Sequence, residues 1–236
     1  MQLFYHPELT SPTFQLPGEE SKHLIKVLRK KVGDQIHFTD GKGKIALCRI
    51  DSISQKSTTL QVLEETIAPE KPYQIHLAIA PTKNADRMEW MTEKTVEIGL
   101  DRMILMKTDN SERNFLKSDR LEKKAVSAMK QSLKSVLTEI ETGLDFKDII
   151  ADPHYAPFEK FIAYVDQNIP NHLFELANPK NKYLILVGPE GDFSPDEINA
   201  AIEAGFKPCS LGHSRLRTET AGLAAVHTLN LLNEIS

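Results

Sequence analysis

The alternation of apolar and polar residues changes character near residue 70. Before that point the pattern is strand-like: "GDQIHFTDGKGKIALCRIDSIS" (33–54) alternates on both sides of the turn-forming "DGKG", which predicts a β-hairpin. "LQVLEE" (60–65) predicts another strand, and "ESKHLIKVLRK" (20–30) predicts a short helix with Leu24, Val27 and Leu28 on one face. Strands without long helices between them predict a small β-barrel.

From residue 73 onward, predicted strands alternate with predicted helices. "YQIHLAIA" (73–80), "RMILMK" (102–107), "KFIAYVD" (160–166) and "YLILV" (183–187) are apolar strands. Helices are expected over 84–98, from Ser118 to about Leu137, after the capping box "SPDE" (194–197), and from about Thr220 to Glu234. This alternation predicts an α/β sheet with helices on both faces.

The segment "APEKP" (68–72) places two prolines and two charged residues between the two patterns. Such a composition is typical of a linker between domains. The predicted domains are therefore residues 1–70 and 71–236.

The composition is that of an ordinary globular protein of 236 residues, with 40% hydrophobic and 26% charged residues. No apolar run approaches the roughly 20 residues that span a bilayer, and the N-terminus lacks the pattern of a signal peptide. Cys48 and Cys209 are far apart, and the histidines show no HxxxH spacing. We therefore expect a cytoplasmic protein with no membrane association, no disulfide framework and no metal site.

The charge is unevenly distributed, although the formal net charge is only −4. Residues 22–49 contain eight lysines and arginines against two aspartates. A local basic patch can bind phosphates whatever the total charge, because screening confines each charge to about 10 Å. The patch therefore indicates either a nucleic-acid contact or a solvated lysine-rich surface. Its candidate RNA-binding residues are Lys22, Lys26, Arg29, Lys30, Lys31, Lys42 and Lys44.

Two loops rich in glycine and charged residues follow predicted strands near the C-terminus. They are "VGPEGDF" (187–193) and "SLGHSRLRTETAGLAA" (210–225). Ligands of open α/β sheets lie outside the carboxyl ends of the strands. Gly188, Gly191 and Gly212 permit close backbone approach or positive φ. One such loop alone would indicate an ordinary turn, whereas two at successive strand ends favour a binding site.

Several familiar sites do not fit these loops. A phosphate-binding P-loop needs GxxxxGK[ST], but "GPEGDFSP" (188–195) has no lysine, and Glu190 and Asp192 would repel phosphate. The GxGxxG fingerprint is absent, and Ser214, which His213 and Asp192 could join in a triad, has no GxSxG elbow. What remains is a pocket of backbone groups with an acidic residue, which suits a neutral or cationic ligand.

"VGPEGDFSPDEI" (187–198) followed by "LGHSRLRTETAGLAAV" (211–226) resembles the paired signature loops of the RsmE family. "HLIKVLRKKVGDQIHFTDGKG" (23–43) and "EKTVEIGLDRMILMKTDNSER" (93–113) resemble two further motifs of that family, so the resemblance extends along nearly the whole chain. Members of the family are SPOUT-class enzymes that use S-adenosylmethionine to methylate N3 of a uridine in small-subunit (16S) ribosomal RNA. The resemblance implies a C-terminal α/β SPOUT domain with a trefoil knot and a small N-terminal PUA-like RNA-binding β-barrel.

The resemblance also implies which residues hold the cofactor. A sulfonium cation tolerates an acidic pocket that would repel phosphate. The residues expected to bind S-adenosylmethionine are Val187, Gly188, Pro189, Glu190, Gly191, Leu211, Gly212, Leu216 and Arg217. The family is generally dimeric, so the apolar residues Leu223, Val226, Leu229 and Leu232 form either a subunit interface or a packing face within their own domain.

The implied reaction assigns roles to the charged residues. Uridine N3 carries a proton on the Watson–Crick edge, so the base must be unpaired and the proton must leave. Arg215 and Arg217 are expected to stabilise the resulting anion, and Glu219 or Glu190 to accept the proton or orient an arginine. Glu219 could instead stabilise a helix N-terminus. The basic N-terminal residues are expected to grip the RNA phosphates of ribosomal RNA or of the 30S particle.

The chain departs from the family pattern in places. Asp192 replaces a usual glycine, Leu216 replaces isoleucine or valine, and Lys130 and Lys134 lie in the atypical stretch "MKQSLKS" (129–135). Two rival functions remain: another SPOUT activity, such as ribose 2′-O-methylation of transfer RNA, and a non-catalytic RNA-binding factor for ribosome assembly. Nucleotide hydrolysis is disfavoured by the missing P-loop lysine.

Overall fold

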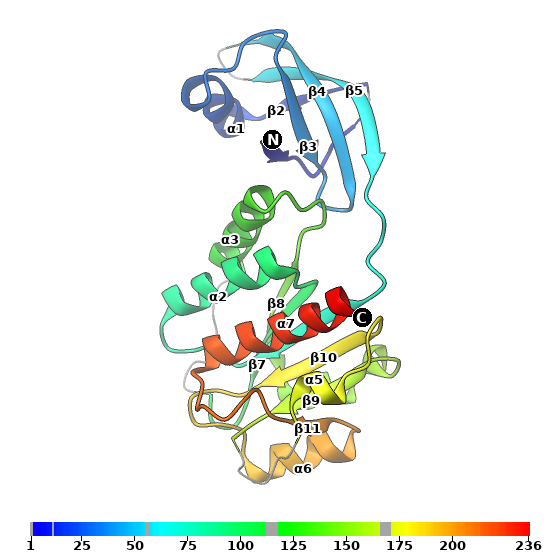
Figure 1. Cartoon of the computed structure of the whole chain (residues 1–236). Coiled ribbons are helices and arrows are strands. Elements are labelled where there is room, and N and C mark those ends of the chain that lie inside the picture. Colours follow the sequence, from blue (N-terminus) through cyan, green and yellow to red (C-terminus); the bar gives the residue numbers. More distant parts are fainter. Residues whose placement is uncertain (1, 11, 55–56, 112–117, 166–170) are drawn as a thin grey trace. The chain divides into compact units, whose positions relative to one another are not determined.

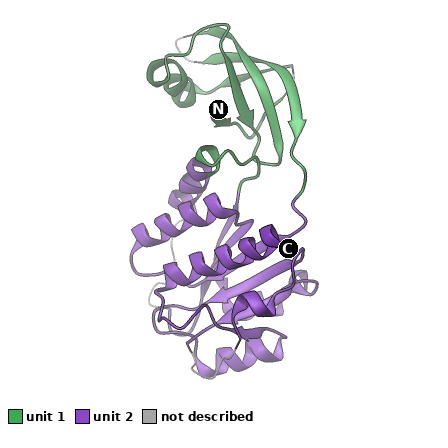
Figure 2. Ribbon diagram, viewed as in Figure 1, with its two compact units in different colours: residues 1–70, 129–137 green, residues 71–128, 138–236 purple. Residues whose placement is uncertain are grey.

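The computed structural model describes residues 2–10, 12–54, 57–111, 118–165 and 171–236. The chain forms two compact units, shown in different colours in Figure 2. Unit 1 comprises residues 1–70 and 129–137, and unit 2 comprises residues 71–128 and 138–236. Residues 129–137 thus belong to unit 1, whereas the sequence pattern placed them in the second predicted domain.

Unit 1 is the β-rich region that the sequence pattern predicts. Its five strands are paired in the order β1-β3-β4-β5-β2. The strands are β1 (Leu3–Tyr5), β2 (Thr13–Leu16), β3 (Gln35–Thr39), β4 (Lys44–Ile53) and β5 (Thr58–Ile67). The predicted hairpin is the antiparallel pair of β3 and β4, in which Phe38 lies opposite Ala46. Alternate residues of these strands, such as Ile36 and Phe38, are buried in the core of the unit.

The predicted helix of unit 1 is wound differently from an ideal α-helix. It consists of α1 (Gly18–Lys22) and a π-helix, η1 (His23–Val27). Leu24 is fully buried, but Val27, expected on the same face, is 65% exposed. A π-helical turn is wider than an α-turn, so residues after it rotate away from the positions that a period of 3.6 predicts. The prediction that Val27 shares the apolar face was therefore wrong.

Residues 129–137 fold against the strands of unit 1. The helix α3 (Ser118–Gln131) ends before the predicted limit near Leu137, and Leu133 has φ 59°. The Ser135 carbonyl then accepts hydrogen bonds from Thr39 Oγ1 (2.9 Å) and Gly43 N (3.0 Å).

The atypical residue Lys130 also has a structural role within unit 1. Its ammonium lies 3.5 Å from Glu20 Oε1 and 5.5 Å from the centre of the Phe4 ring. Lys130 therefore helps to attach the end of α3 to α1 and β1.

Unit 2 contains a six-stranded sheet in the order β11-β9-β10-β6-β7-β8, with every neighbouring pair parallel. The strands are β6 (Gln74–Ile79), β7 (Arg102–Lys107), β8 (Glu139–Asp145), β9 (Glu159–Ala163), β10 (Lys182–Val187) and β11 (Lys207–Cys209). The apolar strands were predicted, except that Asp166, the predicted end of β9, lies outside the described residues. The polar strand β8 and the three-residue strand β11 were not predicted, because both lie at edges of the sheet and lack a long apolar run.

Helices cover both faces of this sheet, as the alternating pattern predicts (Figure 1). One apolar cluster joins the sheet to α2 (Ala85–Ile98), α3, α5 (Leu173–Leu176) and α7 (Thr218–Ile235). The other cluster joins it to α4 (Phe146–Ala151) and α6 (Pro195–Glu203), with Tyr155 from the 3-10 helix η2 (Pro153–Tyr155). Ser194 and Glu197 form the predicted capping box at the start of α6. No helix among the described residues has the length and apolar character needed to cross a bilayer.

Helix α7 packs within its own unit. Val226, Leu229 and Leu232, considered above as a subunit interface, are buried in the apolar cluster that includes α2. Gly222 allows this close packing: a Cβ at that position would lie 2.8 Å from Met91 Sδ and 2.9 Å from Ile79 Cδ1. These apolar residues, with the close approach at Gly222, therefore hold α7 beside α2 and the sheet.

A buried histidine makes the stability of unit 2 sensitive to acid. His76 on β6 is 7% exposed, and its ring lies 4.9 Å from the Phe158 ring and 5.8 Å from the Tyr155 ring between ring centres. Burial, reinforced by the positive charge of Arg102, lowers the pKa of His76 to about 4. The folded state thus favours neutral His76, and this contribution to stability is present above the unfolded pKa of about 6.5. It is lost progressively as the pH falls from there towards 4.

The free energy of unfolding of the wild-type protein should fall between pH 7 and pH 4.5. We expect this fall to be about 2 kcal/mol smaller in His76→Leu, which has no imidazole to protonate. Guanidinium chloride unfolding at the two pH values measures this difference. His227→Leu is the control, because His227 is exposed on α7 and should leave the pH dependence unchanged. Equal pH dependence in wild type and His76→Leu would show that His76 titrates normally in the folded protein.

Candidate functional site

Three neighbouring strands of unit 2 end at one cleft. Parallel pairing places the carboxyl ends of β10, β9 and β11 along the same edge of the sheet. Two cavities of about 520 and 580 Å³ open there. They share the lining residues Ala163, Tyr164, Val165, Arg215, Leu216 and Ala221. We treat them as one cleft between loop 188–194, which follows β10, and loop 210–217, which follows β11.

The end of β9 forms the wall that the sequence prediction missed. Ala163, Tyr164 and Val165 line both cavities. The segment 160–166 was predicted as a strand, and in a parallel sheet its carboxyl end had to lie at the ligand-binding edge. Its position between the two loops depends on the strand order, which the sequence pattern does not give.

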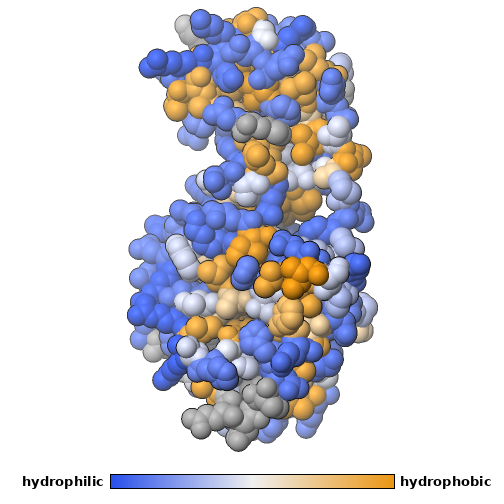
Figure 3. Space-filling view, viewed as in Figure 1, coloured by the Kyte–Doolittle hydropathy of each residue, from blue (hydrophilic) through white to orange (hydrophobic). Residues whose placement is uncertain are grey.

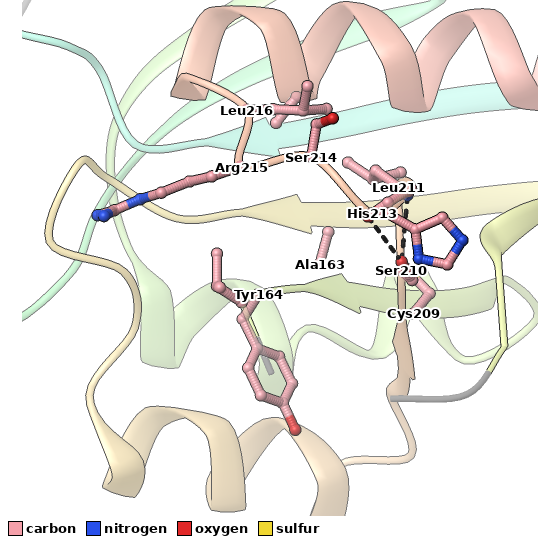
Figure 4. Close-up of a pocket in the computed structure, with 12 residues that line it drawn as sticks. Ala163, Tyr164, Cys209, Ser210, Leu211, His213, Ser214, Arg215 and Leu216 are labelled. Carbon is pink, nitrogen blue, oxygen red and sulfur yellow. Dashed lines mark hydrogen bonds between the residues drawn. The ribbon is translucent and has the colours of Figure 1, made fainter. Parts of the chain in front are cut away.

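Figure 4 shows how the side chains of loop 210–217 diverge. Ser214 and Leu216 lie on the side of α7, and the His213 ring lies near Ser210 and Cys209. The Arg215 side chain extends in the opposite direction from His213. The arginine is therefore free to reach a ligand held between the two loops.

Loop 188–194 begins with buried residues and then carries an exposed acid. Val187, Gly188 and Pro189 are buried, whereas Glu190 is exposed and lines the cleft. Side chains at the two glycines would crowd the loop: a Cβ on Gly188 would lie 3.1 Å from the Phe193 ring, and one on Gly191 would lie 3.3 Å from Asn110 Cβ. Both glycines therefore serve close packing as well as access to the backbone.

The same loop is tied to the segment that follows β7. Asn110 Nδ2 donates to the carbonyl of Asp192 (3.0 Å), and Ser194 Oγ donates to Asp109 Oδ2 (2.8 Å). The buried carboxylate of Glu197 accepts hydrogen bonds from the backbone N–H groups of Asp109 and Ser194, each at 2.9 Å. These bonds fix the loop before any ligand arrives, so little ordering is needed on binding.

Asp192, the departure from the family pattern, connects two walls of the cleft. Its Oδ2 accepts a hydrogen bond from Val165 N at 2.9 Å, and its Oδ1 accepts one from Phe193 N at 2.8 Å. Its φ of 61° lies in the left-handed region, where glycine is favoured and aspartate is tolerated better than most residues. The aspartate thus accepts some backbone strain and supplies a link that glycine cannot make.

Loop 210–217 begins with a compact turn. Ser210 Oγ accepts a hydrogen bond from Gly212 N at 3.1 Å, and Gly212 has φ 118°. Leu211 and Leu216 are half-buried beside the cleft, and the Cys209 thiol at its base is fully buried. Burial raises the pKa of Cys209 to about 12, so this thiol stays neutral at physiological pH.

The predicted catalytic residues occupy two adjacent places. Glu190, Arg215 and Arg217 all line the cleft, and both arginines are exposed. Glu219 lies in the first turn of α7, is 6% exposed, and faces Arg87 of α2 with Nε 3.6 Å from its Oε1. Sequence reasoning missed Arg87, since only the packing of α2 against α7 brings it to this acid.

The predicted RNA-binding residues fall into two groups, one before and one after β3 in unit 1. Lys22, Lys26 and Arg29, with the nearby Lys30 and Lys31, precede β3, whereas Lys42 and Lys44 follow it. The five-residue strand between them spans about 16 Å. Lys44 Nζ lies 3.6 Å from Glu65 Oε2, so part of its charge is already compensated. The structure therefore divides the predicted patch into a larger and a smaller group.

No cluster of three histidine, cysteine or acidic residues suited to a metal ion occurs among the residues that the structure describes. Of the sequence motif 93–113, Glu112 and Arg113 lie outside the described residues.

Comparison with protein families assigns both units. Residues 69–230 match the model of an RNA methyltransferase domain, and residues 16–63 match that of an RNA methyltransferase PUA domain. The first match covers well over half of the chain.

Individual relatives agree with these matches. A crystal structure described as a "probable rRNA-methyltransferase" from Porphyromonas gingivalis is 42% identical, with a TM-score of 0.93, and the similarity covers 100% of this chain and 99% of that one. The ribosomal RNA small subunit methyltransferase E of Neisseria gonorrhoeae, solved with S-adenosyl methionine bound, is 28% identical, with a TM-score of 0.85 over 99% of this chain and 98% of that one. The enzyme of the same name from Bacillus subtilis is 28% identical over 95% of this chain and 92% of its own length. The chain therefore belongs to the RNA methyltransferase family that includes ribosomal RNA small subunit methyltransferase E.

Proposed function

We propose that this protein transfers a methyl group from S-adenosylmethionine to N3 of a uridine in small-subunit ribosomal RNA. Family membership supports an S-adenosylmethionine-dependent methyltransferase of that RNA. The observation that carries the proposal is the cleft, where the two signature loops meet and where Arg215 and Arg217 reach the same space as Glu190.

The cleft has the properties that the cofactor needs. Its walls are backbone and small or aliphatic residues around Gly188, Gly191 and Leu216, and its charged lining consists of the acids Glu190 and Asp192 and the arginines Arg215 and Arg217. The two acids suit a sulfonium cation, and the arginines are left to act on the acceptor base. When bound, the cofactor supplies an electrophilic methyl group. The residues proposed to hold it are Val187, Gly188, Pro189, Glu190, Gly191, Leu211, Gly212, Leu216 and Arg217.

The chain's own charged groups then act on the acceptor base. Loss of the N3 proton places negative charge on the uracil oxygens, and the exposed guanidinium groups of Arg215 and Arg217 can stabilise that charge. Glu190 is the exposed carboxylate of the cleft and is our proposed proton acceptor. Glu219 is buried against Arg87 and is better suited to orient an arginine than to exchange a proton with substrate.

RNA binding is the proposed task of the basic residues of unit 1. Lys22, Lys26, Arg29 and Lys31 are exposed on or after the helical segment, where they can contact successive phosphates. Lys42 is exposed at the other end of β3. The substrate of the proposed reaction is either naked ribosomal RNA or the 30S particle.

We further propose that the protein is a homodimer in the cytoplasm and that its C-terminal segment forms a knot. Apolar residues are exposed on the face over α7 (Figure 3), and this helix exposes Leu231 (38%) and Ile235 (66%). These residues, rather than the buried Val226, Leu229 and Leu232, are available to a second subunit.

The proposal is tested by transfer of labelled methyl groups from S-adenosylmethionine to small ribosomal subunits and to naked ribosomal RNA. Arg217→Ala should lower kcat/KM by about 10²–10³-fold, the usual cost of losing a group that stabilises developing charge. Cofactor affinity, measured by calorimetry, should change by less than about threefold, because Arg217 is proposed to contact the cofactor through its backbone and the base through its guanidinium.

Arg120→Ala is the control, since Arg120 is an exposed arginine on α3 outside the cleft. Near-normal turnover by Arg217→Ala would contradict the proposed role of this arginine. Failure of the wild-type protein to bind S-adenosylmethionine at all would favour the non-catalytic assembly factor.

Asp192 should control how tightly the cofactor is held. Asp192→Gly removes both side-chain hydrogen bonds but relieves the left-handed strain, and we expect cofactor affinity to fall by about 3- to 30-fold with little change in thermal stability. Asp192→Ala also loses the bonds and keeps the strain, so its thermal stability should be lower than that of Asp192→Gly. Calorimetry and thermal unfolding measure the two effects. Undiminished affinity in both variants would show that the bond to Val165 does not position the cleft.

A further inference from the structure

A further cavity of about 600 Å³ opens beside the cleft, between α2 and the start of α7. These two helices lie side by side in unit 2 (Figure 1). The cavity is lined by Asp86, Arg87, Trp90, Arg215, Leu216, Arg217, Glu219 and Thr220. We name it the α2 groove. It shares Arg215, Leu216 and Arg217 with the cleft, so a molecule in the groove borders the proposed cofactor site.

Trp90 is the most unusual residue of the groove. It is the chain's single tryptophan, and it is 44% exposed, whereas Met88 and Met91 of the same helix are fully buried in the core. Trp90 therefore does not serve the packing of α2 against the sheet. A flat indole beside arginine side chains is the arrangement on which proteins stack unpaired bases.

Glu219 fixes the position of the Arg87 cation in the groove. Glu219 is almost completely buried, its Oε1 faces Arg87, and its Oε2 has no hydrogen-bond partner among the described residues. A buried carboxylate requires a nearby cation, so Glu219 holds the Arg87 guanidinium in place. The Arg87 side chain remains 39% exposed and can still contact a ligand.

The three arginines Arg87, Arg215 and Arg217 outnumber the two acids Asp86 and Glu219 of the groove, so its lining carries one net positive charge (3 − 2). This balance suits a ligand with a negative phosphate and carbonyl oxygens, such as a nucleotide of single-stranded RNA. The groove thus combines the stacking surface of Trp90 with arginine cations, and it borders the cleft.

We propose that the α2 groove is the subsite for the acceptor uridine, with the uracil stacked on Trp90 and Arg87 held by Glu219 to contact its phosphate or carbonyl oxygens. This inference rests on the proposed function and adds its substrate-binding residues. A base must leave its pair to expose N3, and a stacking partner offsets the lost base stacking. The shared residues Arg215 to Arg217 would then lie between the base and the cofactor.

The single tryptophan allows a direct test in the full-length protein. A short single-stranded RNA containing 5-iodouridine should quench the Trp90 fluorescence on titration, and ultraviolet light should cross-link that base to the α2 segment containing Trp90. Steady-state methyl transfer to small ribosomal subunits gives the energetic test. Trp90→Ala should raise the KM for the RNA substrate by about 5- to 100-fold, the usual effect of losing one stacking partner.

Trp90→Phe should retain most of the wild-type KM, because phenylalanine still stacks. Ile202→Ala is the matched control: Ile202 is also 44% exposed but lies on α6. Affinity for S-adenosylmethionine should be unchanged in all three variants, which shows that each is folded.

An unchanged KM in Trp90→Ala would overturn the inference, and so would the absence of quenching and cross-linking. A shift of Trp90 emission with protein concentration, without RNA, would also overturn it, because a second copy would then cover the indole. Failure of the wild-type protein to methylate any uridine would contradict the proposed function instead. The fluorescence and cross-linking results would still show whether the α2 groove binds a base.

Discussion

The parallel pairing of β9, β10 and β11 is the constraint on which the site depends. Because their carboxyl ends meet at one edge, segments separated by tens of residues become the walls of a single cleft. The buried strands fix where loops 188–194 and 210–217 begin. Gly222 then lets α7 lie close to Met91 and Ile79, and this sets the position of Arg217 and Glu219 at the start of the helix. Packing beneath the start of α7 thus determines where the charged groups lie.

The two compartments beside α7 share Arg215 and Arg217 and differ in their other charged residues. The cleft adds the acids Glu190 and Asp192, which suit a cationic cofactor. The neighbouring α2 groove contains Arg87 and borders the same Arg215 and Arg217, which suits an anionic acceptor. This separation matches a methyl transfer in which a positive donor meets a base that has lost its proton. Asp192 serves the first compartment through Val165, and Glu219 serves the second through Arg87.

Much of this architecture could be predicted from the sequence, because local signals agreed with the fold. The apolar strands β6, β7, β9 and β10, the capping box of α6 and both signature loops all have strong sequence patterns. Strand order has no such signal, so the wall formed by Ala163 to Val165 was missed. Arg87 was missed for the same reason, since its partner Glu219 is distant in the chain.

Local geometry accounts for the remaining errors. The π-turn rotated Val27 out of the core, and the left-handed Leu133 follows the early end of α3. The stretch after α3 is held instead by hydrogen bonds that its Ser135 carbonyl accepts from the Thr39 hydroxyl and from Gly43 N, and such bonds leave no hydrophobic pattern in the sequence. Lys44 was predicted to bind RNA from its charge alone, and only the structure shows that Glu65 lies beside it.

The central claim is that the bound base presents N3 to the cleft, and the position of the methyl group on the product tests this most directly. Small-subunit ribosomal RNA lacking the modification should be incubated with the protein and S-adenosylmethionine, digested to nucleosides and analysed by mass spectrometry. The account predicts N3-methyluridine at a single site in the RNA. A ribose 2′-O-methyl product, or no methylated uridine at all, would contradict it.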